Sequence, residues 1–231
     1  MATFYFRPAT GNWSAAGTWS NSSGGASNGL VPDATTDCVL DAGSGAFALT
    51  IDGTSGSPNL CRSLVCTGFA NTLTAGATAY LKIGDGTAGA LTLVSGMTFV
   101  PNAAATFEFV STTTGNNITS GGKALPNPIF NGVGGAWTFQ DATTAGNGTI
   151  TITNGSLTTN NQTVLGHLSS SNSNVRSLTL GTTTWTLPSS AGSWNISTST
   201  NMTLSASSAT VVLNSTGNCT FNGGGLTYGT L

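Results

Sequence analysis

Three acidic side chains of this sequence could do chemistry: Asp85, Glu108 and Asp141. Glycosidases act with two carboxylates on either side of the bond they cleave, and stacked strands could bring distant carboxylates onto one face. The local sequence favours structural roles. Asp85 lies in a Gly-Asp-Gly turn, Asp141 follows a predicted strand, and Glu108 is the outward middle residue of Phe107-Glu108-Phe109. We therefore predict no catalytic residue.

A metal site is the next candidate, because carboxylates cluster near the start of the chain. Calcium prefers carboxylate and carbonyl oxygens, but the acidic residues here match no calcium loop such as the EF-hand, and Asp33 reads as the start of a turn. The residues are Asp33, Asp37, Asp41 and Asp52. We predict no metal site.

Two further chemical motifs are incomplete. His167 is the only histidine, so a Ser-His-Asp relay or a multi-histidine metal site would depend on it. Its neighbours suggest neither, and we expect a surface or turn histidine. Gly121-Gly122-Lys123 lacks the spacing and the following helix of a phosphate loop. The sequence thus predicts no cofactor.

The cysteines form neither a metal-binding CxxC pair nor a dense disulfide framework. We expect most of them to be free and buried as small apolar residues, with a disulfide between Cys61 and Cys66 or another pair as the alternative. The four cysteines are Cys38, Cys61, Cys66 and Cys219.

Tryptophans could form a platform on which sugars stack. Three of the five lie at strand positions predicted to point inward, so we expect core packing instead. The five are Trp13, Trp19, Trp137, Trp185 and Trp194.

Composition limits the class of protein. Only 5% of the residues are charged, against about 25% in ordinary soluble domains, and the residues that cover helix surfaces are nearly absent. A helical bundle or an α/β enzyme is excluded. Five scattered Lys and Arg cannot form the basic stripe that nucleic acid requires, so we predict no nucleic-acid partner.

From about residue 60 the chain repeats short apolar-polar-apolar triplets separated by turns of Gly, Asn, Ser or Thr. A period of two predicts strands with one buried face. The clearest triplets lie at 81–83, 91–93, 107–109, 137–139, 150–152, 178–180, 185–187, 194–196, 211–213, 219–221 and 226–228.

Such strands fit two all-β architectures. One is a β-solenoid (parallel β-helix) in which each coil stacks on the previous one; the alternative is a β-sandwich or jelly roll. Outward threonines in place of charges, similar triplets and few hairpin-turn signals favour the solenoid. Thr149–Thr153 resembles the threonine arrays of ice-binding solenoids, but such an array needs Thr-x-Thr on successive coils, and most triplets have one outward Thr.

We expect two regions: residues 1–55 as an N-terminal β cap or attachment segment, and residues 56–231 as the repetitive body. The last triplet reads as one more coil with nothing covering it, so we expect either self-association or a longer product. The opening residues lack the pattern of a signal peptide, and no apolar run approaches the roughly 18 residues of a membrane span. We therefore predict neither classical secretion nor membrane insertion.

The first region carries a resemblance. Its order of motifs resembles the N-terminal region of repetitive β-helical structural proteins of tailed bacteriophages. The motifs are Tyr5-Phe6-Arg7, Gly11-Asn12-Trp13, Trp19-Ser20, Ser23-Gly24-Gly25-Ala26-Ser27, Val31-Pro32 and Asp37-Cys38-Val39-Leu40-Asp41-Ala42.

This resemblance implies a non-enzymatic structural protein of the virion, such as a fibre, an appendage or a capsid-surface component, made in the host cytoplasm. Its implied partners are other virion proteins, further copies of itself in a homo-oligomer (a trimer by analogy) and host surface glycans. Two alternatives share the architecture: a bacterial cell-surface adhesin or filament subunit, and a polysaccharide-degrading tailspike.

Overall fold

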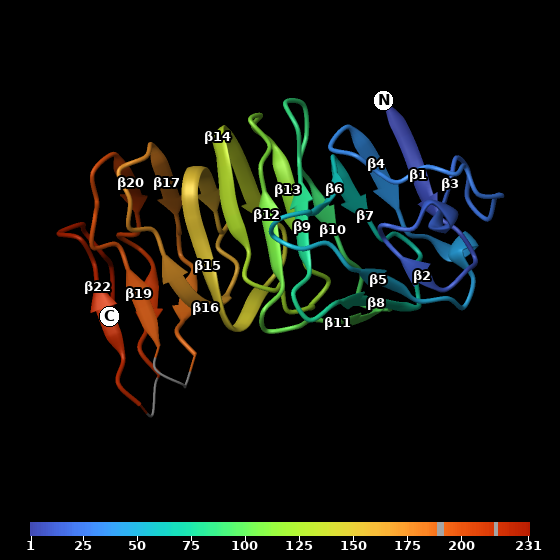
Figure 1. Ribbon diagram of the computed structural model, residues 1–231. Coiled ribbons are helices and arrows are strands. Elements are labelled where there is room, and N and C mark those ends of the chain that lie inside the picture. Colours follow the sequence, from blue (N-terminus) through green and yellow to red (C-terminus); the bar gives the residue numbers. More distant parts are fainter. Residues whose placement is uncertain (189–191, 215–216) are drawn as a thin grey trace.

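The protein is an all-β molecule built around one large, mostly parallel sheet. The computed structural model describes residues 1–188, 192–214 and 217–231, and in that part of the chain helix is limited to the short 3-10 segments η1 (Ala16–Thr18) and η2 (Ala42–Ser44). Figure 1 shows strands stacked along an elongated body, with the N-terminus at one end and the C-terminus at the other. This arrangement is compatible with the predicted β-solenoid.

Three parallel ladders run along the body, here named ladders A, B and C. Ladder A joins the following strands in order: β1 (Ala2–Phe6), β4 (Thr36–Val39), β7 (Ser63–Val65), β10 (Leu91–Thr92), β13 (Asn116–Thr119), the end of β14 (Ile129–Phe139), the end of β15 (Thr143–Thr158), β17 (Arg176–Thr179) and β20 (Met202–Ser205).

Ladder B shares the long strands β14 and β15 with ladder A, and ladder C shares β15. Ladder B joins β6 (Asn59–Cys61), β9 (Tyr80–Ile83), β12 (Thr106–Phe109), the start of β14, the middle of β15, the end of β16 (Val164–Ser169), β19 (Ser193–Asn195) and β22 (Thr220–Asn222). Ladder C has two runs: β2 (Gly11–Asn12), β5 (Leu49–Ile51), β8 (Thr72–Ala75) and β11 (Thr98–Val100), and then the starts of β15 and β16 with β18 (Thr184–Thr186) and β21 (Thr210–Val212).

The chain visits the ladders in a fixed order. From β4 on, a strand of ladder A is followed by one of ladder C and then one of ladder B, as in β7, β8 and β9 or β17, β18 and β19, and one such pass is called a coil here. Between β13 and β14 the isolated bridge of Ala124 with Thr144 stands in place of a ladder C strand. Among the strands of the described residues, only the pair of β1 with β3 (Trp19–Ser20) is antiparallel. A sandwich or jelly roll would pair its strands antiparallel throughout.

The triplet pattern predicts the core well, because alternate residues of each strand point inward. All five tryptophans are fully buried, which confirms that they pack in the core. Inward residues stack in register from coil to coil: Leu64 and Leu91 lie next to each other in ladder A, and the rings of Phe109 and Phe130 stack 5.0 Å apart in ladder B.

Glycine and asparagine set the sharp bends between ladders. Gly155 has φ +76°, and a Cβ there would lie 2.5 Å from the carbonyl oxygens of Gly132 and Gly135, so the coils could not approach with a larger residue. Asparagines replace glycine at other left-handed positions, such as Asn161 (φ 60°) and Asn201 (φ 56°). Asn tolerates this conformation better than most residues.

One predicted strand is wrong. Residues 226–228 form no strand. Instead, the Tyr228 ring packs against Phe221 and Trp194, and its hydroxyl donates to the Gly223 carbonyl at 3.1 Å. The first region joins the same ladders as the body, since β4 pairs with β7 and β5 with β8. A boundary near residue 55 stays a prediction.

Candidate functional site

The three carboxylates considered for catalysis each hold a turn or a coil-to-coil contact. Asp85 Oδ1 accepts from the Thr87 and Ala88 N–H groups at 2.6 and 2.9 Å. Asp141 accepts from the N–H groups of Ser120 and Gly121 at 2.8 and 2.7 Å, in the preceding coil. Both keep the turn positions that the sequence predicts.

Glu108 is more buried than its outward strand position suggests. It lies on the outer side of β12, in register with Lys82 and Ile129, yet only 5% of it is exposed. Its carboxylate accepts from the Tyr80 hydroxyl at 2.9 Å and the Asn131 amide at 2.7 Å.

The third group around Glu108 is cationic. The Lys82 ammonium lies 3.2 Å from the Glu108 carboxylate. Burial, reinforced by the hydrogen bond and the negative charge of Glu108, raises the pKa of Tyr80 to about 12. The phenol of Tyr80 is therefore neutral at neutral pH, and the cluster ties ladder B together across three coils. No hydrogen bond among the described residues links it to Asp85 or Asp141.

The four aspartates of the first region do not converge. Each has its own partner: Thr35 and Thr36 donate to Asp33, Arg62 and Ser63 to Asp37, the Gly43 N–H to Asp41 at the start of η2, and Ser14 to Asp52. Across the described residues, no group of three or more His, Cys, Asp or Glu side chains is arranged to hold a metal ion.

His167 lies in β16 and not in a turn. Its Nδ1 accepts from the Ser193 N–H at 3.0 Å, one coil further along ladder B. Burial lowers its pKa, which keeps the ring neutral at neutral pH. Nδ1 is therefore an acceptor, and the proton of the ring lies on Nε2.

All four cysteines are free, which confirms the main prediction for them. Cys38, Cys61 and Cys66 are buried, and Cys219 is half-buried. Burial raises the pKa of Cys66 well above its ordinary value, and it does the same for Cys38, where the neighbouring Cys61 adds to the effect. Cys38 and Cys66 are therefore protonated and unreactive at neutral pH.

The structure reveals a regular face that the triplet pattern alone does not predict. Along ladder C, outward positions in successive coils carry uncharged residues, mostly threonine with some valine, leucine and asparagine. In the first run Thr72 stands beside Thr98, and Thr74 beside Val100; in the second, Thr184 stands beside Thr210, and Thr186 beside Val212. These side chains are half-buried or exposed.

This face can be recognised only from the register in which strands of neighbouring coils pair, and a single triplet does not show that register. Each strand has two outward residues, i and i+2, which lie about 6.7 Å apart, and neighbouring strands lie about 4.8 Å apart. The two rows of outward side chains, here called ranks, therefore form a rectangular grid. The Thr149–Thr153 run lies in ladder B, where His167 and Ser169 follow it, and so it starts no such grid.

Comparisons with family models, with curated proteins and with solved structures find no match to this chain. In the described part of the chain, no helix has the length and apolar character needed to cross a membrane.

Proposed function

We propose that this chain is a three-sided parallel β-solenoid that acts as a rigid, non-enzymatic structural component of a bacteriophage virion. The observation that supports this fold is the set of parallel ladders, with A and B continuous and C in two runs, which the chain visits in the same order from β7 to β22 except between β13 and β14. The motifs of the first region support the virion role by resemblance. A bacterial surface adhesin of the same architecture is the nearest alternative.

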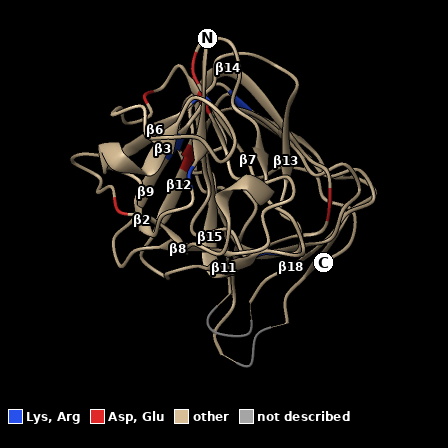
Figure 2. Ribbon diagram, turned by 90° about the vertical axis from the view of Figure 1, so that its right-hand side faces the viewer, with Lys and Arg blue, Asp and Glu red and all other residues tan. Residues whose placement is uncertain are grey.

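Its mechanism is mechanical. Each coil contributes hydrogen bonds to its neighbours on three sides, so a load on one coil is shared along the stack. The few charged side chains also contribute to rigidity, because all seven acidic side chains accept hydrogen bonds from other residues. Figure 2 shows how sparse charged residues are around the body. Such a surface offers little to nonspecific ionic contacts.

The tailspike alternative requires a pair of carboxylates free to act on a glycosidic bond. Asp85, Glu108 and Asp141 have structural partners and no contact with one another, which favours the non-enzymatic role. The test incubates the chain with polysaccharide and measures reducing ends and unsaturated sugars, and we expect none to be released. If they are released, the non-enzymatic role is wrong, and Glu108→Gln and Asp141→Asn show which carboxylate is needed.

Partly buried apolar residues at the last coil support a proposal of self-association. Phe221, Leu226 and Tyr228 pack against the core there but are only partly buried, whereas Phe107, Phe130 and Trp137 in the inner coils are fully buried. We propose that a second copy covers this surface. Light scattering coupled to size exclusion, with electron microscopy of the same fractions, measures mass and shape.

The expected particle is elongated and heavier than the 23.0 kDa chain. Phe221→Glu at the last coil shifts it to monomer, and the matched control Leu165→Glu, an exposed leucine in the middle of ladder C, does not. A compact wild-type monomer overturns the self-association, and a mass that both variants lower equally overturns the assignment to the last coil.

A second candidate function comes from the two-rank face of ladder C, namely adhesion to a regular uncharged lattice such as ice. The test measures how much protein is incorporated into slowly growing ice. Thr184→Lys with Thr210→Lys removes incorporation, and Ser177→Lys with Thr203→Lys, in register on ladder A, leaves it. Exclusion of the wild-type chain from ice rules this function out.

A further inference from the structure

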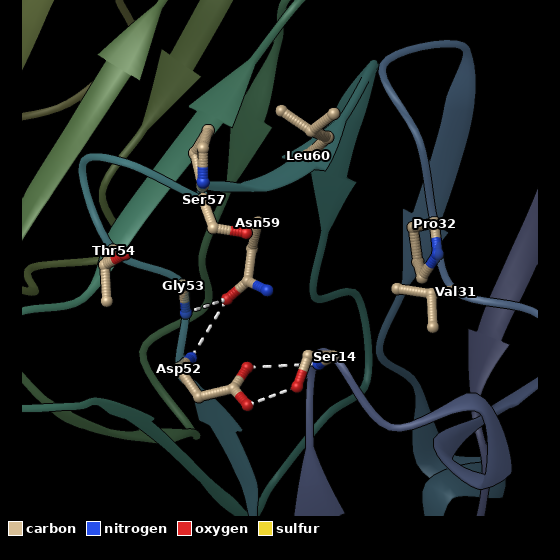
Figure 3. A pocket seen from close by; sticks show the side chains of 10 residues that line it. Ser14, Val31, Pro32, Asp52, Gly53, Thr54, Ser57, Asn59 and Leu60 are labelled. Atoms are coloured by element: carbon tan, nitrogen blue, oxygen red, sulfur yellow. Dashed lines mark hydrogen bonds between the residues drawn. The ribbon is translucent and has the colours of Figure 1, made fainter.

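A hollow of about 330 Å³ lies where the first region meets the start of ladder B. One side comes from the segment between β5 and β6 and from the start of β6, and the other from the loop before β4. Figure 3 shows Ser14, Asp52 and Asn59 on one side of the opening and Val31 with Pro32 on the other. This volume is at the small end of ligand sites, which suits a single small ring.

Asn59 is the residue that points to a ligand. It is only 6% exposed, and its Oδ1 accepts from the N–H groups of Asp52 and Gly53 at 2.9 and 2.6 Å. Two backbone donors fix the orientation of the amide, so its nitrogen must face away from them. Figure 3 shows this nitrogen directed into the open space, and among the described residues no acceptor meets it.

Gly53 makes this arrangement possible. A Cβ at position 53 would lie 2.2 Å from the Asn59 backbone nitrogen, so only glycine lets the chain fold back this closely. The amide is therefore held rigidly, with two N–H donors available to a ligand acceptor. A ligand oxygen that entered the hollow would accept from this amide nitrogen, which no acceptor of the described residues meets.

Asp52 supplies the complementary acceptor. Its Oδ1 accepts from the Ser14 N–H at 3.0 Å and its Oδ2 from the Ser14 hydroxyl at 2.5 Å. Each carboxylate oxygen has capacity for another hydrogen bond. A donor site and an acceptor site thus lie side by side, while Val31, Pro32, Pro58 and Leu60 give apolar walls.

We propose that this hollow binds one ring of a neutral saccharide. One hydroxyl donates to the Asp52 carboxylate, a neighbouring hydroxyl or ring oxygen accepts from the Asn59 amide, and the C–H face of the ring packs on the apolar wall. Asp52 is the only charged residue lining the hollow, which disfavours acidic sugars and phosphates. A metal site is disfavoured because one carboxylate alone is a poor cation site.

This site is independent of the proposed structural role, because its test reads binding and not assembly. Saturation-transfer NMR and calorimetry with methyl glycosides of glucose, galactose, mannose and N-acetylglucosamine show binding of at least one of them. Asp52→Asn keeps an acceptor for the Ser14 N–H but loses the charge, and it weakens binding about ten-fold or more. Asp41→Asn, in the same region but outside the hollow, leaves affinity unchanged.

Asn59→Asp provides the second variant, since it keeps the acceptor for the two backbone N–H groups and removes the donor. It too weakens binding about ten-fold or more. The proposal is overturned if no neutral glycoside binds at tens of millimolar, if glucuronic acid binds as well as glucose, or if Asp41→Asn weakens binding as much as Asp52→Asn.

Discussion

The two parts of the chain on either side of Asp141 solve the same structural problem with different chemistry. Of the five basic and seven acidic residues, all but Arg176 lie at or before Asp141. In the first part, carboxylates such as Asp85 and Asp141 accept the N–H groups of turns, alongside amides such as Asn59. In the second part, amides do so: Asn161 Oδ1 accepts from the Thr182 N–H at 2.9 Å.

The one charge of the second part is buried in a cage of oxygen atoms. The Arg176 guanidinium is 2% exposed and donates to four carbonyls, those of Ser170, Asn174, Thr198 and Thr200, and to the Ser170 hydroxyl. No carboxylate of the described residues pairs with it, and burial lowers its pKa. The guanidinium thus holds turns by their carbonyls and not by their N–H groups, and its five donors reach several turns at once.

Removing that guanidinium is expected to have the largest effect. Arg176→Ala leaves its carbonyl acceptors without a donor and opens a cavity, which lowers the free energy of unfolding by about 3 kcal/mol or more. Arg176→Lys recovers less than half, because an ammonium lacks the planar five-donor fork. Urea unfolding followed by circular dichroism measures both.

Lys123→Ala is the control for Arg176, since Lys123 makes one carbonyl hydrogen bond from an exposed position and its loss is expected to cost under about 0.5 kcal/mol. Equal losses for the two substitutions would mean that Arg176 does not hold the second part together.

Glu108 is the nearest counterpart of Arg176 in the first part, and its loss is expected to have the second-largest effect. Glu108→Ala leaves the Tyr80 hydroxyl and the Asn131 amide without their acceptor, at a cost of about 2 to 3 kcal/mol. Glu108→Gln keeps one acceptor oxygen and costs about half as much. The same urea experiment checks this, and a Glu108→Ala cost near zero would show that the cluster does not stabilise ladder B.

The two parts also differ in how acid affects them. In the first part, hydrogen bonds from Thr35 and Thr36 lower the pKa of Asp33 below 3.8. Burial alone would raise the pKa of Asp85, but the hydrogen bonds from Thr87 and Ala88 outweigh it, and this pKa too lies below 3.8. A carboxylate with a depressed pKa stabilises the fold above its unfolded pKa, and that contribution is lost as the pH falls through the folded pKa.

His167 makes the second part sensitive to acid at a higher pH. Its pKa lies below 6.5 in the folded state, so the unfolded chain binds the proton first and stability starts to fall as the pH drops below about 6.5. Hydrogen exchange measured by mass spectrometry, corrected for intrinsic rates, should show peptides of 142–231 losing protection at a higher pH than those of 1–141. His167→Gln should remove this difference, and a simultaneous loss in both parts would contradict it.

Much of the fold could be predicted because a period of two determines which residues face inward. Trp137, Trp185 and Trp194 needed only their triplets to be placed in the core. The ladder C face could not be predicted, since Thr184 and Thr210 become neighbours through turn lengths that set the register. The burial of Glu108 could not be predicted either, because it depends on Tyr80 and Asn131 from adjacent coils.

The hollow beside Asp52 escapes prediction for a related reason. The sequence groups Asp52 with other aspartates as a possible metal ligand, whereas its actual neighbours are Ser14 and Asn59. No count of carboxylates suggests an amide donor, and the orientation of Asn59 depends on a tight turn at Gly53.

Replacing an amide that holds a turn in the second part by a carboxylate, as used in the first part, is expected to have the smallest effect. It tests the comparison between the two parts most directly. Asn161 has a left-handed backbone, and its Oδ1 holds the Thr182 N–H. Asn161→Ala loses this bond and strains the turn, at a cost of about 1 to 2 kcal/mol. Asn161→Asp keeps the acceptor and tolerates the conformation, so the free energy of unfolding at pH 7 should change by under about 0.5 kcal/mol. At pH 3 the Asp variant should lose stability that the wild type keeps, because its carboxylate becomes protonated. If Asn161→Asp is as damaging as Asn161→Ala at pH 7, the amide itself is required, and carboxylate and amide turn holders are not interchangeable.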